Sequence, residues 1–447
     1  MSKAQTSPET PKRRRIEPRT LQGFSDYLPK QMVTRRYVEN TLRKVFESFG
    51  YGELQTPCLE YQEILTGKYG EDEKLIYKFT DNGDRKVALR YDLTVPLARV
   101  IGQHQNEITL PFKRYHIEKV WRADSPRKGR KREFYQCDVD IVGVANIAAD
   151  AEILLILHTG FAALGLDDHI IMLNNRQITN AFIRTLNIPE DKAIEVFRSI
   201  DKYDKVGLEG VEKELKERGI EQKNIPEILE FIDCDGKSNQ QILEQAESRV
   251  GSDPDGQKGI EQIKSVLEIL EHYGVPEKNI RFNLRLARGL DYYTSLVFEV
   301  LVPKFGGMSL AGGGRYGELC GLFAGKEITA TGVAFGFEPI CAALEEFGLG
   351  PKLHVADVLV TVFGEAYLRD SLEISQKLRA AGLKVELYPD PTAKLGKQFK
   401  YADANNIPYA IVIGEDEKKK KEVMLKNMQS GEQETVNPGE LIKRLAK

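Results

Sequence analysis

The chain has 447 residues, in which 64 Lys and Arg residues nearly balance 67 Asp and Glu residues to give a formal net charge of −3. This length predicts roughly two to four domains with sizeable cores and excludes a single small module. The near-neutral charge excludes a uniformly basic surface, so a nucleic-acid partner would have to be bound by local basic patches.

The cysteine and histidine patterns argue against a metal centre or a disulfide framework. Five cysteines are scattered without a C-x-x-C pair, and the six histidines show no H-x-x-x-H spacing. This predicts reduced thiols in a cytoplasmic protein and no protein-ligated transition metal. No apolar run is long enough to cross a membrane, so no membrane association is expected.

The first 19 residues carry the basic run Lys12-Arg13-Arg14-Arg15 among prolines and contain no apolar core. This composition excludes a secretory signal and predicts that residues 1–19 form a disordered basic head. A nuclear-import or RNA-contacting tail is the alternative.

The next segment predicts a helix followed by a strand. Apolar residues recur at helical spacing between 31 and 49, namely Val38, Leu42, Val45, Phe46 and Phe49. Residues 53–60 (ELQTPCLE) then form a predicted strand interrupted by Pro57, which is typical of a sheet edge.

Residues 85–160 alternate strand and helix patterns, with a helix expected from about Thr94. Residues 112–143 read FKRYHIEKVWRADSPRKGRKREFYQCDVDIVG, two alternating strands around a basic connector. A hairpin of this kind predicts an antiparallel sheet and an α+β fold rather than a doubly wound one. The connector from Arg127 to Arg132 suits phosphate groups, although a solvated basic loop explains it equally well.

Two further stretches predict separate units. Residues 174–278 are charged and helical, and we expect a helical insertion there; the alternative is a lid without an RNA role. One apolar helical face is formed by Ile260, Ile263, Val266, Leu267, Leu270 and Tyr273. From 354 to 447, strands and helices alternate, which predicts a small sheet covered by helices.

The most informative segment is RGLDYYTSLVFEV at 288–300. An arginine, an acid and two phenols at one strand–turn junction can bind a small polar ligand, because a guanidinium pairs with phosphate or carboxylate and phenols offer flat walls. Alone, the segment is more simply explained as a strand that enters a turn. It is followed in order by AGGGRYGEL (311–319) and TGVAFGFEP (331–339).

Together with the 112–143 hairpin, these segments resemble the histidyl-tRNA synthetases, a family of class II aminoacyl-tRNA synthetases. The likeness extends from about Thr20 to the C-terminus. It implies a catalytic domain with an antiparallel sheet in two parts, 20–173 and 279–350, around the helical insertion at 174–278. It also implies a C-terminal α/β anticodon-binding domain at 354–447. In the family, the helix and proline-containing strand between 31 and 60 build a homodimer interface.

The resemblance implies ATP-dependent ligation of L-histidine to its cognate tRNA through a histidyl-adenylate, with Mg²⁺ accompanying ATP. Such chemistry needs positive charge around the phosphates, because negative charge is redistributed during in-line displacement. Arg122, Arg130 and Arg288 match the family's ATP-binding arginines. Arg122 and Arg288 also match its catalytic groups.

The resemblance also assigns the histidine-binding residues. Tyr293 and Asp140 match the residues that contact the imidazole ring, although the family more often has Glu at the second position. Tyr292 adds a wall and a hydroxyl group. The remaining contacts match Asp92, Thr94 and Gln136 at the α-amino group, and Gly312 and Gly313 where the backbone approaches the ligand. A helix N-terminal acid is the alternative for Asp92, and a tight turn for the glycines.

One position departs from the family pattern. The family's third motif ends in an arginine that contacts ATP, whereas this chain reads Gly336-Phe337-Glu338-Pro339. Proline still permits a helix to start, and another cation such as Arg315 or Lys326 could replace the missing contact.

The proline leaves open a second interpretation, a synthetase-like regulatory subunit of ATP phosphoribosyltransferase in histidine biosynthesis, which senses histidine and charges no tRNA. A pseudo-synthetase sensor fused to a kinase is excluded because the sequence carries no kinase signature.

Overall fold

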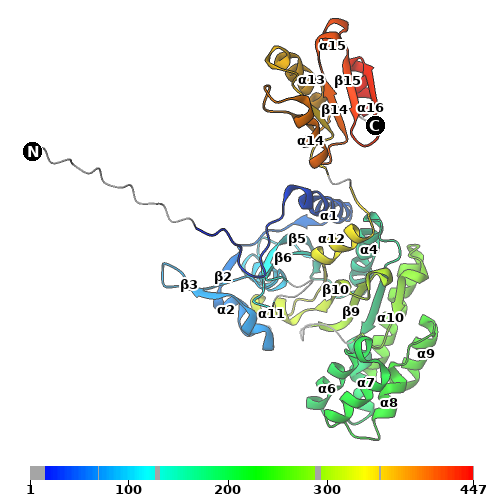
Figure 1. The fold of residues 1–447 in the computed structure, drawn as a ribbon. Helices are drawn as coiled ribbons and strands as arrows, with labels where there is room; N and C mark the ends of the chain where they lie inside the picture. Colours follow the sequence, from blue (N-terminus) through cyan, green and yellow to red (C-terminus); the bar gives the residue numbers. More distant parts are fainter. Residues whose placement is uncertain (1–15, 69, 126–130, 287–292, 352–353, 446–447) are drawn as a thin grey trace, which may run out of the picture.

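The catalytic body is built on an eight-stranded sheet (Figure 1). The computed structural model describes residues 16–68, 70–125, 131–286, 293–351 and 354–445. The five central strand pairs are antiparallel and the two outermost pairs are parallel, which confirms the α+β expectation. The strand order is β1 (Gly52–Glu53), β5 (Phe112–Trp121), β6 (Glu133–Val142), β11 (Ala330–Phe335), β10 (Ser309–Tyr316), β9 (Tyr293–Leu301), β7 (Ile170–Asn175) and β8 (Ile280–Phe282).

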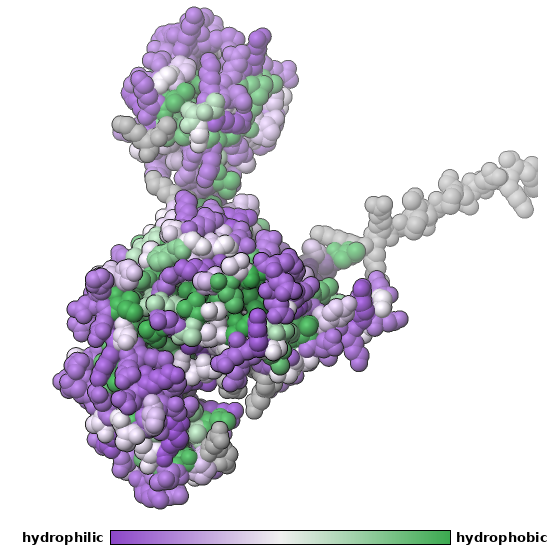
Figure 2. Space-filling model, turned by 180° about the vertical axis from the view of Figure 1, so that it is seen from behind, coloured by the Kyte–Doolittle hydropathy of each residue, from purple (hydrophilic) through white to green (hydrophobic). Residues whose placement is uncertain are grey.

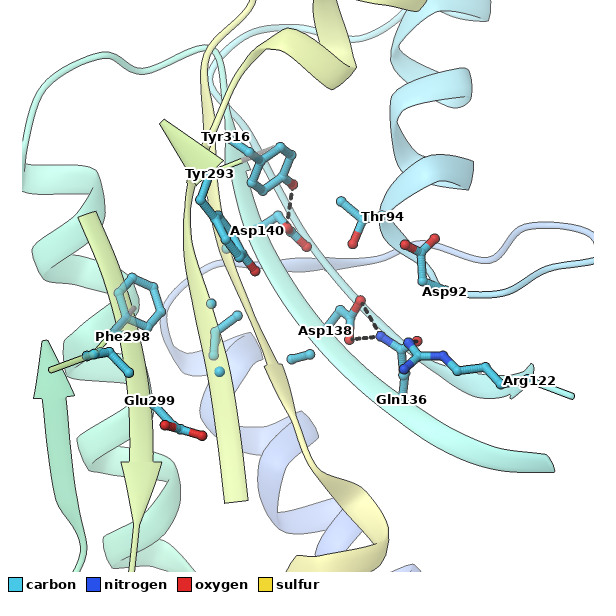
Figure 3. Close-up of a pocket in the computed structure, with 16 residues that line it drawn as sticks. Asp92, Thr94, Arg122, Gln136, Asp138, Asp140, Tyr293, Phe298, Glu299 and Tyr316 are labelled. Carbon is cyan, nitrogen blue, oxygen red and sulfur yellow. Dashed lines mark hydrogen bonds between the residues drawn. The ribbon is translucent and has the colours of Figure 1, made fainter. Parts of the chain in front are cut away.

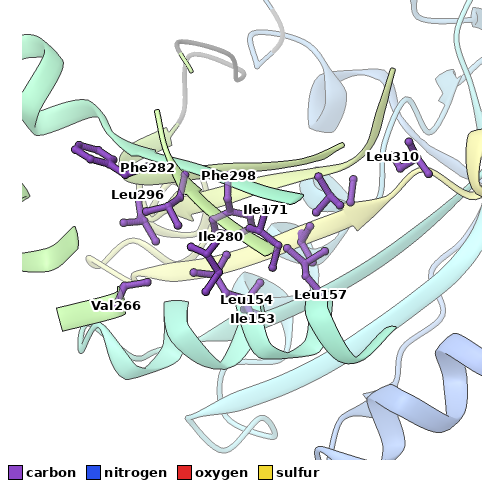
Figure 4. Close-up of a cluster of buried hydrophobic side chains, with 14 of the residues drawn as sticks. Ile153, Leu154, Leu157, Ile171, Val266, Ile280, Phe282, Leu296, Phe298 and Leu310 are labelled. Atoms are coloured by element: carbon purple, nitrogen blue, oxygen red, sulfur yellow. The ribbon is translucent and has the colours of Figure 1, made fainter. Parts of the chain in front are cut away.

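Helices α1 (Pro29–Ser48) and α4 (Ala148–Ala163) pack against one face of this sheet. The apolar stripe expected between 31 and 49 is buried except at Phe49, which follows the helix and is half-buried, and Leu42 and Phe46 are fully covered. On α4, Ile153, Leu154 and Leu157 point toward the apolar side chains of the sheet (Figure 4). The core therefore lies between the sheet and these helices, because the apolar face of α1 and the largely apolar surface of α4 must be removed from water.

The strand expected at 53–60 is divided between two sheets. β1 ends at Glu53, whereas β2 (Leu59–Tyr61) joins a small antiparallel sheet with β4 (Lys86–Leu89) and β3 (Lys78–Thr80). Pro57 lies between the two strands and has no backbone N–H to donate to a ladder. The chain therefore leaves the large sheet at this point.

The region between β7 and β8 is helical. Its helices are α5 (Arg176–Thr185), α6 (Glu190–Ile200), α7 (Tyr203–Glu217), α8 (Ile225–Ile232), α9 (Asn239–Val250) and α10 (Pro254–His272). The rings of Phe182 and Phe231 stack with their centroids 3.7 Å apart and link α5 to α8. The predicted apolar face of α10 is confirmed except at Tyr273, which follows the helix and is 67% exposed.

The C-terminal unit has its own sheet and its own core. The strands are ordered β13 (Val385–Leu387), β12 (Val358–Val360), β14 (Tyr409–Val412), β15 (Val423–Asn427) and β16 (Gln433–Val436). The accompanying helices are α13 (Leu368–Ala380), α14 (Leu395–Ala404), α15 (Glu415–Lys420) and α16 (Pro438–Leu445). Figure 2 shows this unit as a separate body whose visible surface is largely hydrophilic. Within the described part of the chain, no helix has the length and apolar character needed to cross a membrane.

A buried ion pair joins the sheet to α4. Asp150 of α4 is fully buried, and Arg315 of β10 is 6% exposed. The Arg315 Nε donates to Asp150 Oδ2 (3.0 Å), and its Nη1 donates to the carbonyl oxygen of Val144 (2.8 Å) and to Thr329 Oγ1 (3.0 Å). Arg315 therefore fastens the sheet to the loop before α4 and is not available to replace the cation missing at Pro339.

Asp150→Ala should destabilise the protein strongly, because it leaves the Arg315 charge buried without its partner. Breaking a buried pair in this way costs about 3–5 kcal/mol. Urea unfolding followed by circular dichroism measures the loss. The matched control is Glu434→Ala, which removes the partner of Arg444 in an exposed ion pair and should leave the unfolding curve unchanged. Similar shifts in both variants would contradict a structural role for the buried pair.

Candidate active site

A cavity of about 290 Å³ opens on the sheet face opposite α1 and α4. Along β6, Cys137, Val139 and Ile141 belong to the apolar core. The intervening residues Gln136, Asp138 and Asp140 line the cavity (Figure 3). Because successive side chains of a strand point to opposite faces, the alternation in β6 places three polar groups in one row.

The inner end of this row is formed by Asp140, which is 3% exposed. The Nη2 of Arg114 on β5 lies 2.8 Å from Asp140 Oδ2, and the Tyr316 hydroxyl donates to Asp140 Oδ1 at 2.5 Å. Burial raises the pKa of Asp140, while Arg114 and Tyr316 favour the ionised form. The Asp140 carboxylate is thus held in one orientation at the base of the cavity.

Arg122 lies at the opposite end of the row. Its Nε donates to the carbonyl oxygen of Tyr91 (3.1 Å), and its Nη2 donates to Gln136 Oε1 (3.3 Å). The guanidinium carbon also lies 4.4 Å from the ring centroid of Tyr91 and 5.2 Å from that of Phe134. These contacts orient a permanent cation at the cavity edge, where it can meet an anionic group of a ligand.

Asp92 and Thr94 enter the cavity from the start of α3 (Thr94–Gln103). Asp92 Oδ1 accepts a hydrogen bond from the Val95 backbone N–H (3.1 Å), so the acid also satisfies an N-terminal donor of the helix. Both the predicted ligand contact and its alternative, a helix N-terminal acid, are therefore compatible with its position.

The glycines of β10 and β11 let the sheet pack closely around the cavity. A Cβ at Gly332 would overlap the Asp140 carboxylate that lies opposite it on β6. A Cβ at Gly313 would lie 2.7 Å from the ring of Phe298, so Gly313 is required by packing within the sheet. At Gly312 the nearest heavy atom would be 3.8 Å away, which leaves this position open to a ligand.

The structure brings most of the predicted site residues together. Those that line the cavity are Asp92, Thr94, Arg122, Gln136, Asp140, Tyr293, Gly312 and Gly313, and their individual roles stay predictions. Arg130, Arg288 and Tyr292 lie outside the described residues. Among the described side chains, no group of three or more His, Cys, Asp or Glu is arranged to hold a metal ion.

Several lining residues were not predicted from the sequence, including Asp138, Phe298, Glu299, Tyr316 and Gly332. For Asp138 a signal was present, because it lies two residues from both Gln136 and Asp140 in a strand of period two. Tyr316 and Gly332 reach the cavity through pairing between β10, β11 and β6, which the sequence does not display.

Helix α12 (Phe337–Glu346) begins where expected, and Pro339 is its third residue. The neighbouring Glu338 accepts two hydrogen bonds from Arg35 of α1, at 2.7 and 2.9 Å. The hydroxyl of Tyr27 donates to the same carboxylate at 3.1 Å. The start of α12 is therefore held by Glu338, independently of the residue at 339.

Comparison with known proteins agrees with this geometry. Residues 23–340 match the family model of histidyl-tRNA synthetase, and residues 357–447 match that of an anticodon binding domain. A histidine–tRNA ligase of Cytophaga hutchinsonii is 38% identical over 453 aligned positions, which cover 96% of this chain and 99% of the relative.

Solved structures show the same fold. The histidyl-tRNA synthetase from Nostoc sp. has a TM-score of 0.86 and 32% identity, and the match covers 96% of this chain and 99% of that one. A Bacillus halodurans protein, described as an ATP phosphoribosyltransferase regulatory subunit/histidyl-tRNA synthetase, has a TM-score of 0.75 at 22% identity. That match covers 86% of this chain and 97% of the other and bears on the fold alone.

The antiparallel sheet, its long β5–β6 hairpin and the polar cavity beside the hairpin define a class II aminoacyl-tRNA synthetase. The family match over residues 23–340 and the near-complete coverage of the relatives narrow this class further. The chain belongs to the histidyl-tRNA synthetase family.

Gly332→Ala should lower the melting temperature, because the added methyl group would displace the Asp140 carboxylate from Arg114 and Tyr316. Overpacking of this kind costs about 1–3 kcal/mol. The matched control is Gly396→Ala in α14, where an added Cβ would meet no heavy atom within 4 Å. That change should raise stability by about 0.5–1 kcal/mol. Equal melting temperatures for the two variants would contradict close packing at the cavity base.

Proposed function

We propose that this protein is a histidine–tRNA ligase, which activates L-histidine with ATP and transfers it to its cognate tRNA. The observation that carries this proposal is a single cavity with an acidic row along β6 and an oriented arginine at its edge. It is supported by relatives named histidine–tRNA ligases that align over nearly the whole chain.

In the first step, the histidine carboxylate attacks the α-phosphorus of ATP, pyrophosphate leaves, and histidyl-adenylate forms. The protein's task is to stabilise the negative charge that is redistributed among the phosphate oxygens. We assign this task to Arg122, together with Arg130 and Arg288, which the family resemblance places at the phosphates. Mg²⁺ would enter with the triphosphate and contribute further positive charge.

In the second step, a ribose hydroxyl at the tRNA 3′ end attacks the carbonyl carbon of the adenylate, and AMP leaves. Neither step requires a covalent bond to the protein. The cavity therefore has to orient three reactants, which favours fixed polar groups over a reactive side chain.

We assign the imidazole ring to the inner end of the cavity. A neutral imidazole has one N–H donor and one acceptor nitrogen, so it needs two complementary partners. The Asp140 carboxylate can accept from the N–H, and the Tyr293 hydroxyl can donate to the other nitrogen, with Tyr292 as a further wall. Asp92, Thr94 and Gln136 are assigned to the α-amino group, and the open backbone at Gly312 to the body of the substrate.

We further propose a cytoplasmic homodimer that binds tRNA at more than one place. β1 is a two-residue edge strand of the large sheet, and a partner subunit would cover this edge. The C-terminal unit is assigned to the anticodon, supported by its match to an anticodon-binding model. The helical insertion is assigned to the acceptor stem.

The regulatory-subunit interpretation rested on Pro339. The full-length agreement with named ligases and the match at 357–447 favour the ligase, since a histidine sensor has no need of an anticodon-binding unit.

The wild-type protein should catalyse histidine-dependent exchange of pyrophosphate into ATP and should charge a histidine tRNA. A protein truncated after residue 353 should retain most of the exchange and lose most of the charging, because the cavity-lining residues all precede residue 335. Absence of exchange by the intact chain at saturating ATP and magnesium would replace the ligase with the regulatory interpretation. Normal charging by the truncated protein would refute the anticodon assignment.

Pro339→Arg should lower the KM for ATP roughly tenfold, because it restores a stacking and charge-assisted contact. The substitution adds a backbone N–H in the first helical turn, where N–H groups have no acceptor within the helix, so the helix should remain intact. The matched control is Pro254→Arg, the same exchange at the start of α10, which should leave every kinetic constant unchanged. An unchanged KM for ATP in Pro339→Arg would show that ATP is not contacted from this position.

A further inference from the structure

Asp138 is an acid of the cavity to which none of the proposed substrate contacts has been assigned. It is 2% exposed, lies on β6 and lines the cavity. Its carboxylate accepts from the uncharged amide of Gln136, whose Nε2 lies 3.2 Å from Oδ1 and 3.3 Å from Oδ2. A buried carboxylate that meets a neutral donor is costly to ionise unless a positive charge compensates it.

Among the residues that the structure describes, the groups around Asp138 do not supply a balancing cation of its own. Two further acids act on Asp138: Asp140 on the same strand, and Asp92 from the start of α3. On β5, Arg114 attracts it but is already paired with Asp140. Opposite Asp138 in the strand register lies His116, where burial and the nearby arginines lower the pKa to about 2. That imidazole is therefore neutral near pH 7.

The remaining neighbours are also neutral or already engaged. On β11, Ala334 pairs with Asp138 in the register. Toward the cavity edge, the Gln136 amide lies between Asp138 and Arg122, donating to the first and accepting from the second. Within the described part of the chain, Asp138 thus has no positive charge of its own to balance its carboxylate, and a cationic group of a ligand can supply one.

The spacing along β6 indicates which part of a ligand this is. Asp138 lies between Asp140 and Gln136, and Arg122 follows beyond Gln136 (Figure 3). Residues two apart in a strand are separated by about 6.5 Å. A histidine with its ring at Asp140 and its carboxylate toward Arg122 would place its α-carbon in the middle of the row, beside Asp138.

We propose that Asp138 binds the α-ammonium group of the histidine substrate and, by accepting from Gln136, positions the amide that orients Arg122. This assignment rests on the proposed ligase function and adds a specificity-determining acid to it. One carboxylate thereby links recognition of the amino group to the cation at the reacting phosphate.

Binding of the ammonium group should change the protonation of Asp138. Burial, followed by Asp140 and Asp92, raises the pKa of Asp138 to about 8 in the ligand-free protein, although Arg114 acts in the opposite direction. Below that pH the acid holds a proton, and an arriving ammonium group favours the ionised form. Histidine binding at pH 7 should therefore release close to one proton, and affinity should rise as the pH increases toward about 8.

The decisive variant is Asp138→Asn, because the asparagine oxygen can still accept from Gln136 while the charge is removed. Calorimetric titration with L-histidine in two buffers of different ionisation enthalpy measures the released protons directly. The wild-type protein should release nearly one proton at pH 7 and the variant none. The KM for histidine should rise roughly ten- to a hundredfold, with the KM for ATP unchanged within about twofold.

Two ligands and two further variants separate the possible roles. Histidinol keeps the ammonium group and should lose affinity as histidine does, whereas imidazole propionate lacks that group and should bind both proteins equally. Asp138→Ala should lower kcat as well, since Gln136 and Arg122 lose their support. Asp168→Asn on the surface, where the side chain is 52% exposed, is the matched control and should behave like the wild-type protein.

A thermal melt shows whether the variant is folded. The pKa of Asp138 is higher in the folded protein than in the unfolded chain, so this group destabilises the fold increasingly as the pH rises from the unfolded-state pKa toward about 8. Asp138→Asn removes that effect and should melt no lower than the wild-type protein at pH 8. Unchanged proton release or unchanged histidine affinity in this variant overturns the assignment alone. A wild-type protein that binds neither histidine nor imidazole propionate overturns the ligase function and the assignment with it.

Discussion

The site depends on the period-two geometry of the β5–β6 hairpin. Each strand of this hairpin is ten residues long, and one side of β6 packs against the helices while the other side lines the cavity. Because a slip of one residue would exchange the two sides, the apolar residues Cys137, Val139 and Ile141 determine the register. The same register places Gln136, Asp138 and Asp140 along the cavity. Core packing and the polar lining of the cavity are therefore set by one strand alignment.

Three arginine–carboxylate pairs hold the elements around this hairpin. Arg114 and Asp140 join β5 to β6 at the cavity base, and Arg315 and Asp150 join β10 to α4. Arg35 and Glu338 join α1 to α12. Buried charges of this kind add little net stability compared with apolar packing, but they are expensive to break, and a guanidinium accepts only a narrow range of geometries. In this protein the pairs therefore fix how the joined strands and helices are oriented, and add little to the overall stability.

The proline at the end of the third motif fits this arrangement. The ion pair between Arg35 and Glu338 and the buried side chains of Phe337 and Ile340 hold α12 in place, so its position does not depend on residue 339 alone. Compared with the arginine of the family pattern, Pro339 carries no positive charge. Arg122, directly after β5, is a cation that the structure does orient at the cavity edge, where it is held by Tyr91 and Gln136. In this chain the acidic row of β6 supports that arginine through the Gln136 amide.

The sequence by itself determined the local patterns and, through them, the family. The apolar stripe of α1, the alternation along 112–143 and the helical character between β7 and β8 are short-range periodicities, so they could be read directly. The family resemblance carried by four ordered motifs then implied the fold class and half of the cavity-lining residues. The prediction of one strand at 53–60 was wrong, because the proline signals an interruption without showing which sheet accepts the next residues.

Only the tertiary structure decided how distant segments meet. Tyr316 and Gly332 reach Asp140 through the strand order β6–β11–β10, and Arg315 turns away toward Asp150 on the opposite side of the sheet. The charge of Asp138 is left without a partner of its own among the described residues, because His116 beside it is neutral and Arg114 is paired with Asp140. Such relations depend on pairing between residues far apart in the chain and on exclusion of water. Periodicity tells which side chains share a face, whereas the charge balance of a cavity exists only after the sheet has closed around it.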